Sequence, residues 1–166
     1  MNFEIRQAES RDIEGMSVVV DSAWRKNYRH IFTDEQISAF TGNRRRESFT
    51  KILNDGKDVY VLTVYSMITA VCAAQSCEEP QFAEYAEIIQ LYVLPGYQRM
   101  GFGRKLLSYT LQKLSDKDFK GAFLYTAEKN ENACRFYEKC GFTACNNKKF
   151  GGVVYIGYKI DFNLVF

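Results

Sequence analysis

The segment that most constrains this fold is a long apolar run from Glu84 to Val93, with apolar residues at odd and even positions alike. Such a run is typical of a central strand that is covered on both faces. A glycine-rich turn, a helical segment from about Phe102 to Ser115 and a second strand, Ala122 to Ala127, follow it. Strands joined through a helix form a right-handed βαβ unit, so we predict that these two pair in parallel.

Shorter strands are predicted on either side of this unit. Apolar and polar residues alternate over Phe3–Gln7, which indicates a first strand. Two strand-like runs, Val59–Tyr65 and Met67–Gln75, have so little between them that they predict a hairpin. Two last strands are expected near Phe142–Lys148 and Val153–Asp161.

Helical spacing accounts for most of the remaining chain. A first helix is expected after Ser10, which we predict to be its N-cap. A second helix begins near Thr33, a third covers Arg44 to Leu53, and a short helix after the second strand of the βαβ unit covers Glu131 to Cys140. The chain has 166 residues and no evident linker or repeat, so we expect residues 1–166 to form a single domain.

Composition excludes several classes of protein. Apolar residues make up 46% of the chain and the formal net charge is only +2, so neither nucleic acid nor an anionic membrane is demanded as a partner. The basic triplet Arg44–Arg46 is expected on a solvated helix face. Five cysteines without a CxxC pair indicate neither a disulfide framework nor a metal site. The first residues do not resemble a signal peptide, so a cytoplasmic location is expected.

The glycine turn carries the strongest functional signal. Gly101 and Gly103 let a ligand approach main-chain N–H groups, and the first N–H groups of a helix favour an anion. Arg104 and Lys105 lie in the first helical turn, where positive charge is unfavourable unless an anion is bound. The two glycines by themselves are about equally consistent with a tight turn that binds nothing and with a ligand-binding turn. No P-loop string is present, and Leu106 stands where a dinucleotide fingerprint needs its third glycine.

Two spaced motifs resemble those of a known family. Gln98-Arg99-Met100-Gly101-Phe102-Gly103 matches the central signature of the GNAT superfamily of acyl-CoA-dependent N-acetyltransferases. The second signature of that family is matched at every position, by Asn130, Ala133, Tyr137, Gly141 and Phe142. The resemblance implies an α/β (α+β) fold, with a mixed, mostly antiparallel sheet of six to seven strands, a central parallel pair and about four to five flanking helices.

The resemblance also implies where acetyl-CoA, the cosubstrate, would bind. The N–H groups from Arg99 to Arg104 would hold the pyrophosphate, and Leu91 to Val93 would pair with the pantetheine arm. The N–H of Val93 would polarise the thioester carbonyl, as a fixed donor aimed at a developing oxyanion does. The implied cofactor-binding residues are Leu91, Tyr92, Val93, Gln98, Arg99, Met100, Gly101, Phe102, Gly103, Arg104, Asn130, Asn132 and Tyr137.

Tyr137 has two readings. It belongs to an apolar stripe with Ala133, Phe136 and Cys140, which by itself favours a core residue. The resemblance implies that its phenol protonates the departing thiolate of CoA, and a phenol is protonated at neutral pH and can serve as a general acid. Gly141 is expected to end this helix, and Asn130 or Asn132 could cap its start.

Glu87 is the predicted general base. By strand alternation it shares a face with Ile89, Leu91 and Val93, and partial burial there would raise its pKa. A bulge or the start of the strand could instead leave it solvated, with about equal odds. Glu84 and the hydroxyl of Tyr92 are lesser candidates.

The acceptor stays open at this point. We expect direct transfer from acetyl-CoA to a primary amine of a small molecule, such as a polyamine or an antibiotic. A protein N-terminal or lysine acetyltransferase and a non-catalytic acyl-CoA sensor are the alternatives. Whether the chain forms a homodimer stays open. The expected acceptor wall is Trp24 to Ile37, with Trp24, Tyr28 and Phe32. Asp21, Asp34 and Glu35 could attract a cation, but we expect them on the surface.

Overall fold

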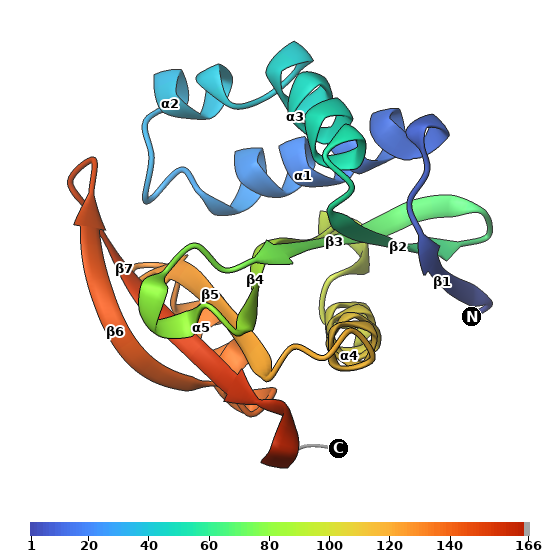
Figure 1. Cartoon of the computed structure of the whole chain (residues 1–166). Helices are drawn as coiled ribbons and strands as arrows, with labels where there is room; N and C mark the ends of the chain where they lie inside the picture. Colours follow the sequence, from blue (N-terminus) through green and yellow to red (C-terminus); the bar gives the residue numbers. More distant parts are fainter. Residues whose placement is uncertain (165–166) are drawn as a thin grey trace. The chain divides into compact units, whose positions relative to one another are not determined.

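A computed structural model describes residues 1–164 of the chain, and these form a seven-stranded mixed sheet with five α-helices (Figure 1). The strands are β1 (Phe3–Gln7), β2 (Asp58–Val64), β3 (Met67–Ser76), β4 (Tyr85–Val93), β5 (Gly121–Ala127), β6 (Thr143–Phe150) and β7 (Val153–Asp161). The helices are α1 (Ile13–Asn27), α2 (Asp34–Ala39), α3 (Asn43–Asn54), α4 (Phe102–Ser115) and α5 (Glu131–Lys139).

Hydrogen bonds join the strands in the order β1-β2-β3-β4-β5-β7-β6. The strands β4 and β5 pair in parallel, with Glu87 opposite Phe123, whereas β1–β2, β2–β3, β5–β7 and β6–β7 are antiparallel. The predicted mixed sheet and its parallel pair are therefore confirmed. In the part of the chain that the structure describes, no helix combines the length and apolar character that a membrane span requires.

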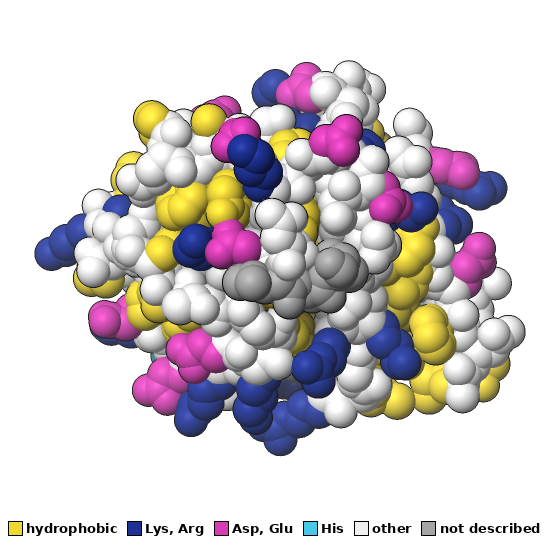
Figure 2. Space-filling model, turned by 60° about the horizontal axis from the view of Figure 1, so that its bottom comes forward, with side chains coloured by type: hydrophobic (Ala, Val, Ile, Leu, Met, Phe, Trp, Pro, Cys, Tyr) yellow, Lys and Arg dark blue, Asp and Glu magenta, His cyan; other side chains and the backbone are white. Residues whose placement is uncertain are grey.

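The chain folds into two compact units. The first comprises Met1–Ala74 and Gln90–Thr110, and the second comprises Gln75–Ile89 and the described residues from Leu111 to Leu164. The elements β3, β4 and α4 each contribute residues to both units. The face drawn in Figure 2 carries side chains of both charge signs, as a net charge of only +2 leads one to expect.

The first unit is built on the antiparallel strands β1, β2 and β3. Its core is formed by side chains that are fully buried, among them Met16, Val20, Phe49 and Leu62. These come from α1, α3 and β2, so one face of each helix packs on the strands, as their amphipathic sequences require. The hairpin between β2 and β3 turns without glycine, because Tyr65 and Ser66 both adopt positive φ angles, 48° and 67°.

An ion pair, rather than Ser10, organises the start of α1. Ser10 begins a short 3-10 turn, so the predicted N-cap was wrong. The buried carboxylate of Asp12 instead accepts two hydrogen bonds from the Arg6 guanidinium, at 2.7 and 2.8 Å, and one from the Glu9 N–H. The hydrogen bond from Arg6 holds the pKa of Asp12 below its usual value.

A second buried ion pair links α1 to α3. Asp21 accepts hydrogen bonds from the Gly42 N–H at 2.8 Å and from Nε of Arg45 at 3.3 Å. Only 9% of Asp21 and 8% of Arg45 is exposed. The expectations that Asp21 lies on the surface and that the Arg44–Arg46 triplet is uniformly solvated were therefore wrong. A charge is stable in this position because its partner lies on the neighbouring helix, which helical spacing alone does not reveal.

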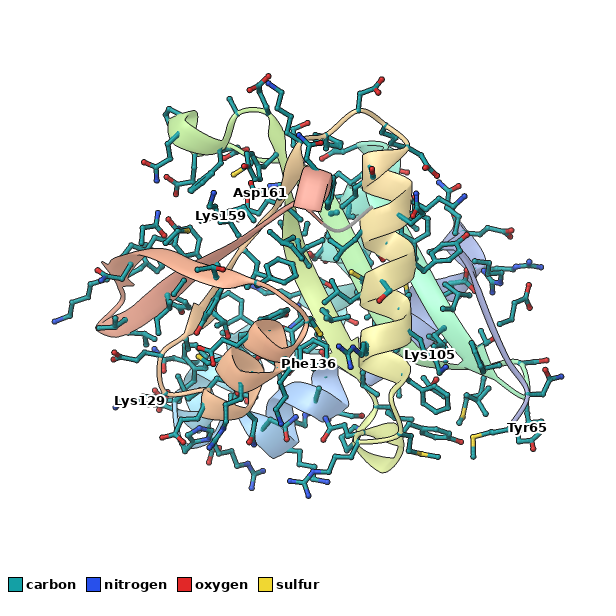
Figure 3. The ribbon with its side chains drawn as sticks, turned by 90° about the horizontal axis from the view of Figure 1, so that it is seen from below. Tyr65, Lys105, Lys129, Phe136, Lys159 and Asp161 are labelled. Atoms are coloured by element: carbon teal, nitrogen blue, oxygen red, sulfur yellow. The ribbon has the colours of Figure 1, made fainter. Side chains whose placement is uncertain are left out.

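The second unit contains β5, β6, β7 and α5. In this unit Gly121 of β5 lies between Tyr85 of β4 and Asp161 of β7, which pair with it on its two sides. Because Gly121 has no side chain, the Tyr85 hydroxyl reaches across β5 and donates a hydrogen bond to Asp161. Lys159 lies next to Asp161 on β7 (Figure 3), and its Nζ is 3.2 Å from the same carboxylate.

A Cβ at Gly121 would overlap the carbonyl oxygen of Ile160 and the ring of Tyr85. We expect Gly121→Ala to lower the free energy of unfolding by about 1–3 kcal/mol, because the backbone cannot move away without breaking the sheet. Urea denaturation measures this change. The matched control is Gly96→Ala, where no atom lies within 4 Å of the added Cβ. An effect within about 0.5 kcal/mol at both positions would show that the crossing at Gly121 is not tightly packed.

Candidate functional site

The glycine turn holds two residues in the left-handed region. Arg99 has a φ of 63° and Gly101 a φ of 82°. The turn is tied to the end of β4, because the Gln98 side chain donates a hydrogen bond to the carbonyl of Val93 at 3.1 Å. Lys105 N–H donates to the Gly101 carbonyl at 3.0 Å, which is the bond expected where a helix begins. The N–H groups of Phe102, Gly103 and Arg104 therefore precede the helical hydrogen bonds of α4.

The surroundings of this turn suit an anion. A Cβ on Gly101 would have no atom within 4 Å, so the space beside this glycine is open and only its φ angle requires glycine. Phe102 is buried and its ring contacts those of Phe3 and Tyr97, with centroids 6.0 and 6.2 Å apart. Lys105 lies in the first turns of α4 (Figure 3) with its Nζ 5.2 Å from the ring of Phe3. The turn thus combines main-chain donors with nearby positive charge.

The end of β4 is connected to an aromatic cluster on α1 and the segment after it. Trp24 donates a hydrogen bond from Nε1 to the Tyr92 hydroxyl at 3.1 Å. The ring of Trp24 stacks on those of Tyr28 and Phe32, with centroids 4.9 and 5.4 Å apart. The aromatic run that the sequence places in the acceptor wall therefore lies together as one cluster, beside the strand residue Tyr92.

Glu87 lies on β4 within the second unit and is half-buried. It pairs in register with Phe123, so the open alternative of a bulge does not describe it. Burial raises the pKa of Glu87, in part offset by a hydrogen bond with the Gln75 side chain and by the charge of Lys148. The negative charges of Glu78 and Glu79 also raise the pKa of Glu87. The predicted environment of Glu87 is confirmed, and its role as a base stays a prediction.

The lesser candidates for a base are engaged in other contacts. Glu84 forms an exposed ion pair with Lys120, whose Nζ lies 2.6 Å from its carboxylate. The Tyr92 hydroxyl accepts the hydrogen bond from Trp24. Of the two carboxylates, Glu84 is exposed and Glu87 is half-buried, so Glu87 is the more desolvated candidate.

Tyr137 is held on α5 by the way this helix ends. Gly141 adopts a φ of 95°, and the Phe142 N–H donates to the carbonyl of Tyr137 at 3.0 Å, which is the Schellman arrangement predicted for a C′ glycine. Tyr137 is only 9% exposed, and its ring contacts those of Phe142 and Tyr158. The Tyr158 hydroxyl donates to Glu138 at 3.1 Å, which ties α5 to β7. Tyr137 is thus a packed residue in a fixed position.

The two asparagines differ in their local role. Asn130 is the N-cap of α5, because its side chain accepts a hydrogen bond from the Ala133 N–H at 3.3 Å. Asn132 lies in the first turn of the helix and is exposed. Of the two cap candidates, Asn130 is therefore the one that the structure supports.

The predicted residues fall into the two units. The first unit contains those from Leu91 to Arg104, whereas Glu87, Asn130, Asn132 and Tyr137 belong to the second. A further polar group in the second unit, formed by Glu79, Tyr125, Asn146 and Lys148, did not emerge from the sequence. The glycine at position 157, in the middle of the strand Val153–Asp161, was the signal that could have pointed to it.

Known proteins resemble this chain over about half of its length or more. The acetyltransferase (GNAT) family matches residues 18–142. The chain is 27% identical over 148 residues to spermidine N(1)-acetyltransferase of Thermoplasma acidophilum, covering 86% of this chain and 89% of that protein. It is 34% identical over 84 residues to N-alpha-acetyltransferase 50 of Danio rerio, which covers 49% of this chain and 48% of that protein.

The fold is also that of a solved structure with its ligand. The PaiA N-acetyltransferase of Thermoplasma acidophilum, in complex with coenzyme A, superposes with a TM-score of 0.83 and 21% identity, over 96% of this chain and 100% of that one. Together with the family match over residues 18–142, the two spaced signatures and the parallel β4–β5 pair, this identifies the chain as a member of the acetyltransferase (GNAT) family.

Proposed function

We propose that this N-acetyltransferase transfers the acetyl group of acetyl-CoA to a primary amine of a small molecule, a polyamine in particular, by direct attack. Residues 1–166 would act as one catalytic domain. The observation that carries the proposal is the turn from Gln98 to Arg104, in which left-handed Arg99 and Gly101 lead into the start of a helix. Such a start binds phosphate groups through N–H groups that have no helical partner.

The residues of the turn and the strand end would divide the work of binding acetyl-CoA. The main chain of Arg99 to Arg104 would hold the pyrophosphate, and the Gln98 side chain would keep this turn against Val93, to whose carbonyl it donates. Leu91 to Val93 would offer main-chain groups to the pantetheine arm. Acetyl-CoA supplies the acetyl group as a thioester, and the Val93 N–H would stabilise negative charge on its carbonyl oxygen.

Two residues would move protons. Glu87 would accept the proton of the attacking ammonium, directly or through water, because a half-buried carboxylate is a stronger base than an exposed one. Attack forms the C–N bond and breaks the C–S bond. The Tyr137 phenol would give its proton to the departing sulfur, and Asn130, Asn132 and Tyr137 would contact CoA.

The acceptor class is supported by similarity and by the aromatic cluster. The relative from Thermoplasma acidophilum, which this chain matches over 89% of that protein, is a spermidine N(1)-acetyltransferase. Trp24, Tyr28 and Phe32 would form an apolar wall for the acceptor beside Tyr92, and cations bind well over such rings. Acetylation of protein N-termini is the second candidate, because the chain also matches N-alpha-acetyltransferase 50 of Danio rerio.

One assay tests the proposal as a whole. The full chain is incubated with acetyl-CoA and a panel of polyamines, alkylamines, aminoglycosides and short peptides, and thiol release is followed together with the product mass. We expect acetylated polyamines and little reaction with peptides. Acetylation of peptide N-termini alone would transfer the proposal to the second candidate.

We expect Gly101→Val to weaken acetyl-CoA binding by about tenfold or more, because a β-branched residue is strained at a φ of 82° and would distort the turn. Calorimetry with acetyl-CoA measures the change. Gly56→Val is the matched control, since Gly56 has a similar φ of 68° but lies in the α3–β2 connection. Equal affinities of both variants and the parent would exclude the turn as the binding site.

We expect Tyr137→Phe to lower kcat by ~10²–10⁴-fold and to leave acetyl-CoA affinity nearly unchanged. The substitution keeps the ring that packs against Phe142 and Tyr158 and removes only the proton donor. Steady-state kinetics and calorimetry give the two quantities. Unchanged turnover in a folded variant would leave Tyr137 as a core residue only.

We expect Glu87 to produce the acid limb of the pH–rate profile. A base works only when it is deprotonated, so the rate rises with pH through the pKa of Glu87, which burial places above the ordinary value of 4.5. Glu87→Gln should remove this limb and slow the reaction at neutral pH, with partial recovery at high pH where the amine loses its proton unaided. An unaltered profile would assign the proton to water or to another group.

A further inference from the structure

An ammonium group of the protein itself is bound on the second unit. The Nζ of Lys148 lies 3.8 Å from the centroid of the Tyr125 ring and 4.0 Å from Oε1 of Glu79. An aromatic face with a carboxylate at its rim is the combination that recognises an alkylammonium ion. The structure therefore contains a site of this kind, with a lysine side chain as its occupant.

The site is held in place by contacts that do not involve Lys148. The Tyr125 hydroxyl donates to Glu79 at 3.0 Å and accepts from Nδ2 of Asn146 at 3.3 Å. Asn146 reaches Tyr125 across β7 at Gly157, which pairs with both residues and has no side chain in the way. The ring and the carboxylate would thus keep their positions if the lysine moved out.

The Lys148 side chain can move away from the Tyr125 ring and the Glu79 carboxylate. This side chain is 48% exposed. Lys148 lies on β6, an edge strand of the sheet whose residues are nearly all exposed. An ion pair with a separation of 4.0 Å, whose side chains are 48% and 32% exposed, contributes little to stability. The lysine therefore binds weakly enough to be displaced by a ligand of the same charge.

The site lies on the same face of the β4–β5 pair as the proposed general base, Glu87. Phe123 pairs in register with Glu87, and Tyr125 lies two residues further along β5, on the same face of the strand as Phe123. The charges of Lys148, Glu78 and Glu79 all act on Glu87. A molecule with two ammonium groups could therefore place one at Glu87 and the other at Tyr125.

We propose that the Tyr125 ring and the Glu79 carboxylate form a subsite for the second, non-reacting ammonium of a linear diamine or polyamine, and that Lys148 occupies this subsite when no acceptor is bound. The inference rests on the proposed function and specifies its acceptor by the number of charges. Lys148 then acts as an internal competitor, which the acceptor displaces.

Kinetics on three variants of the full chain test this subsite. The probes are linear diamines from diaminopropane to diaminooctane, each compared with the monoamine of equal chain length. We expect Lys148→Met to lower KM for the diamines that span the two positions by about threefold to fivefold, and Glu79→Gln to raise it by a similar factor. The matched control is Lys149→Met, which removes the same charge from an exposed position on the opposite face of β6.

The monoamines separate a subsite from a general effect of charge. A subsite changes the KM of diamines alone, whereas a change that is equal for monoamines, or equal in Lys149→Met, overturns the proposal. Calorimetry without acetyl-CoA measures the dissociation constants of the diamines, and we expect these to change between variants by the same factors as KM. If no amine is acetylated, the proposed function fails. The subsite is then tested by calorimetry alone: tighter binding of diamines to Lys148→Met than to the parent supports it, and equal binding overturns it.

Discussion

The second unit depends on two strand positions that lack a side chain. Gly121 of β5 and Gly157 of β7 each lie between two residues on neighbouring strands. At Gly121 the Tyr85 hydroxyl crosses to Asp161, and at Gly157 the Asn146 amide crosses to Tyr125. Any larger residue would meet these side chains. These side-chain hydrogen bonds connect strands that are already joined by backbone hydrogen bonds. They also hold the rings of Tyr85 and Tyr125 in position.

The polar groups that cross the sheet also set the surroundings of Glu87. Burial and the carboxylates of Glu78 and Glu79 raise its pKa, while Gln75 and Lys148 act against them. Glu79 is in turn held by Tyr125 and lies close to Lys148. A residue proposed to accept a proton is therefore linked electrostatically to a site proposed to bind a charge, which would couple acceptor binding to the basicity of Glu87.

The proposed donor site in the first unit is formed mainly by main-chain groups. The turn from Gln98 to Arg104 owes its form to two left-handed residues and to the hydrogen bond from Gln98 to Val93. Its side chains mostly anchor it, as Phe102 does against Phe3 and Tyr97. One fold can host different functions through different site residues. In this chain the proposed donor site depends on backbone geometry, and the proposed acceptor wall depends on side chains such as Trp24 and Tyr28.

The sequence by itself determined the elements and the family. Strand alternation and helical spacing are local, so β1 and α4 begin and end at the predicted residues, and the Gly141 cap of α5 follows from neighbours along the chain. The two signatures are also short-range patterns, and the residues that form them carry the resemblance to the GNAT family.

Tertiary structure decided which charged and polar residues meet. The buried pair of Asp21 and Arg45 joins two helices, and the ammonium of Lys148 lies over a ring from another strand. Their partners are far apart in the chain, and no periodicity records them. Even the half-burial of Glu87, which alternation indicated, needed the sheet to exclude the bulge. The physical reason is that charge burial depends on the partner that compensates it, and the fold alone supplies that partner.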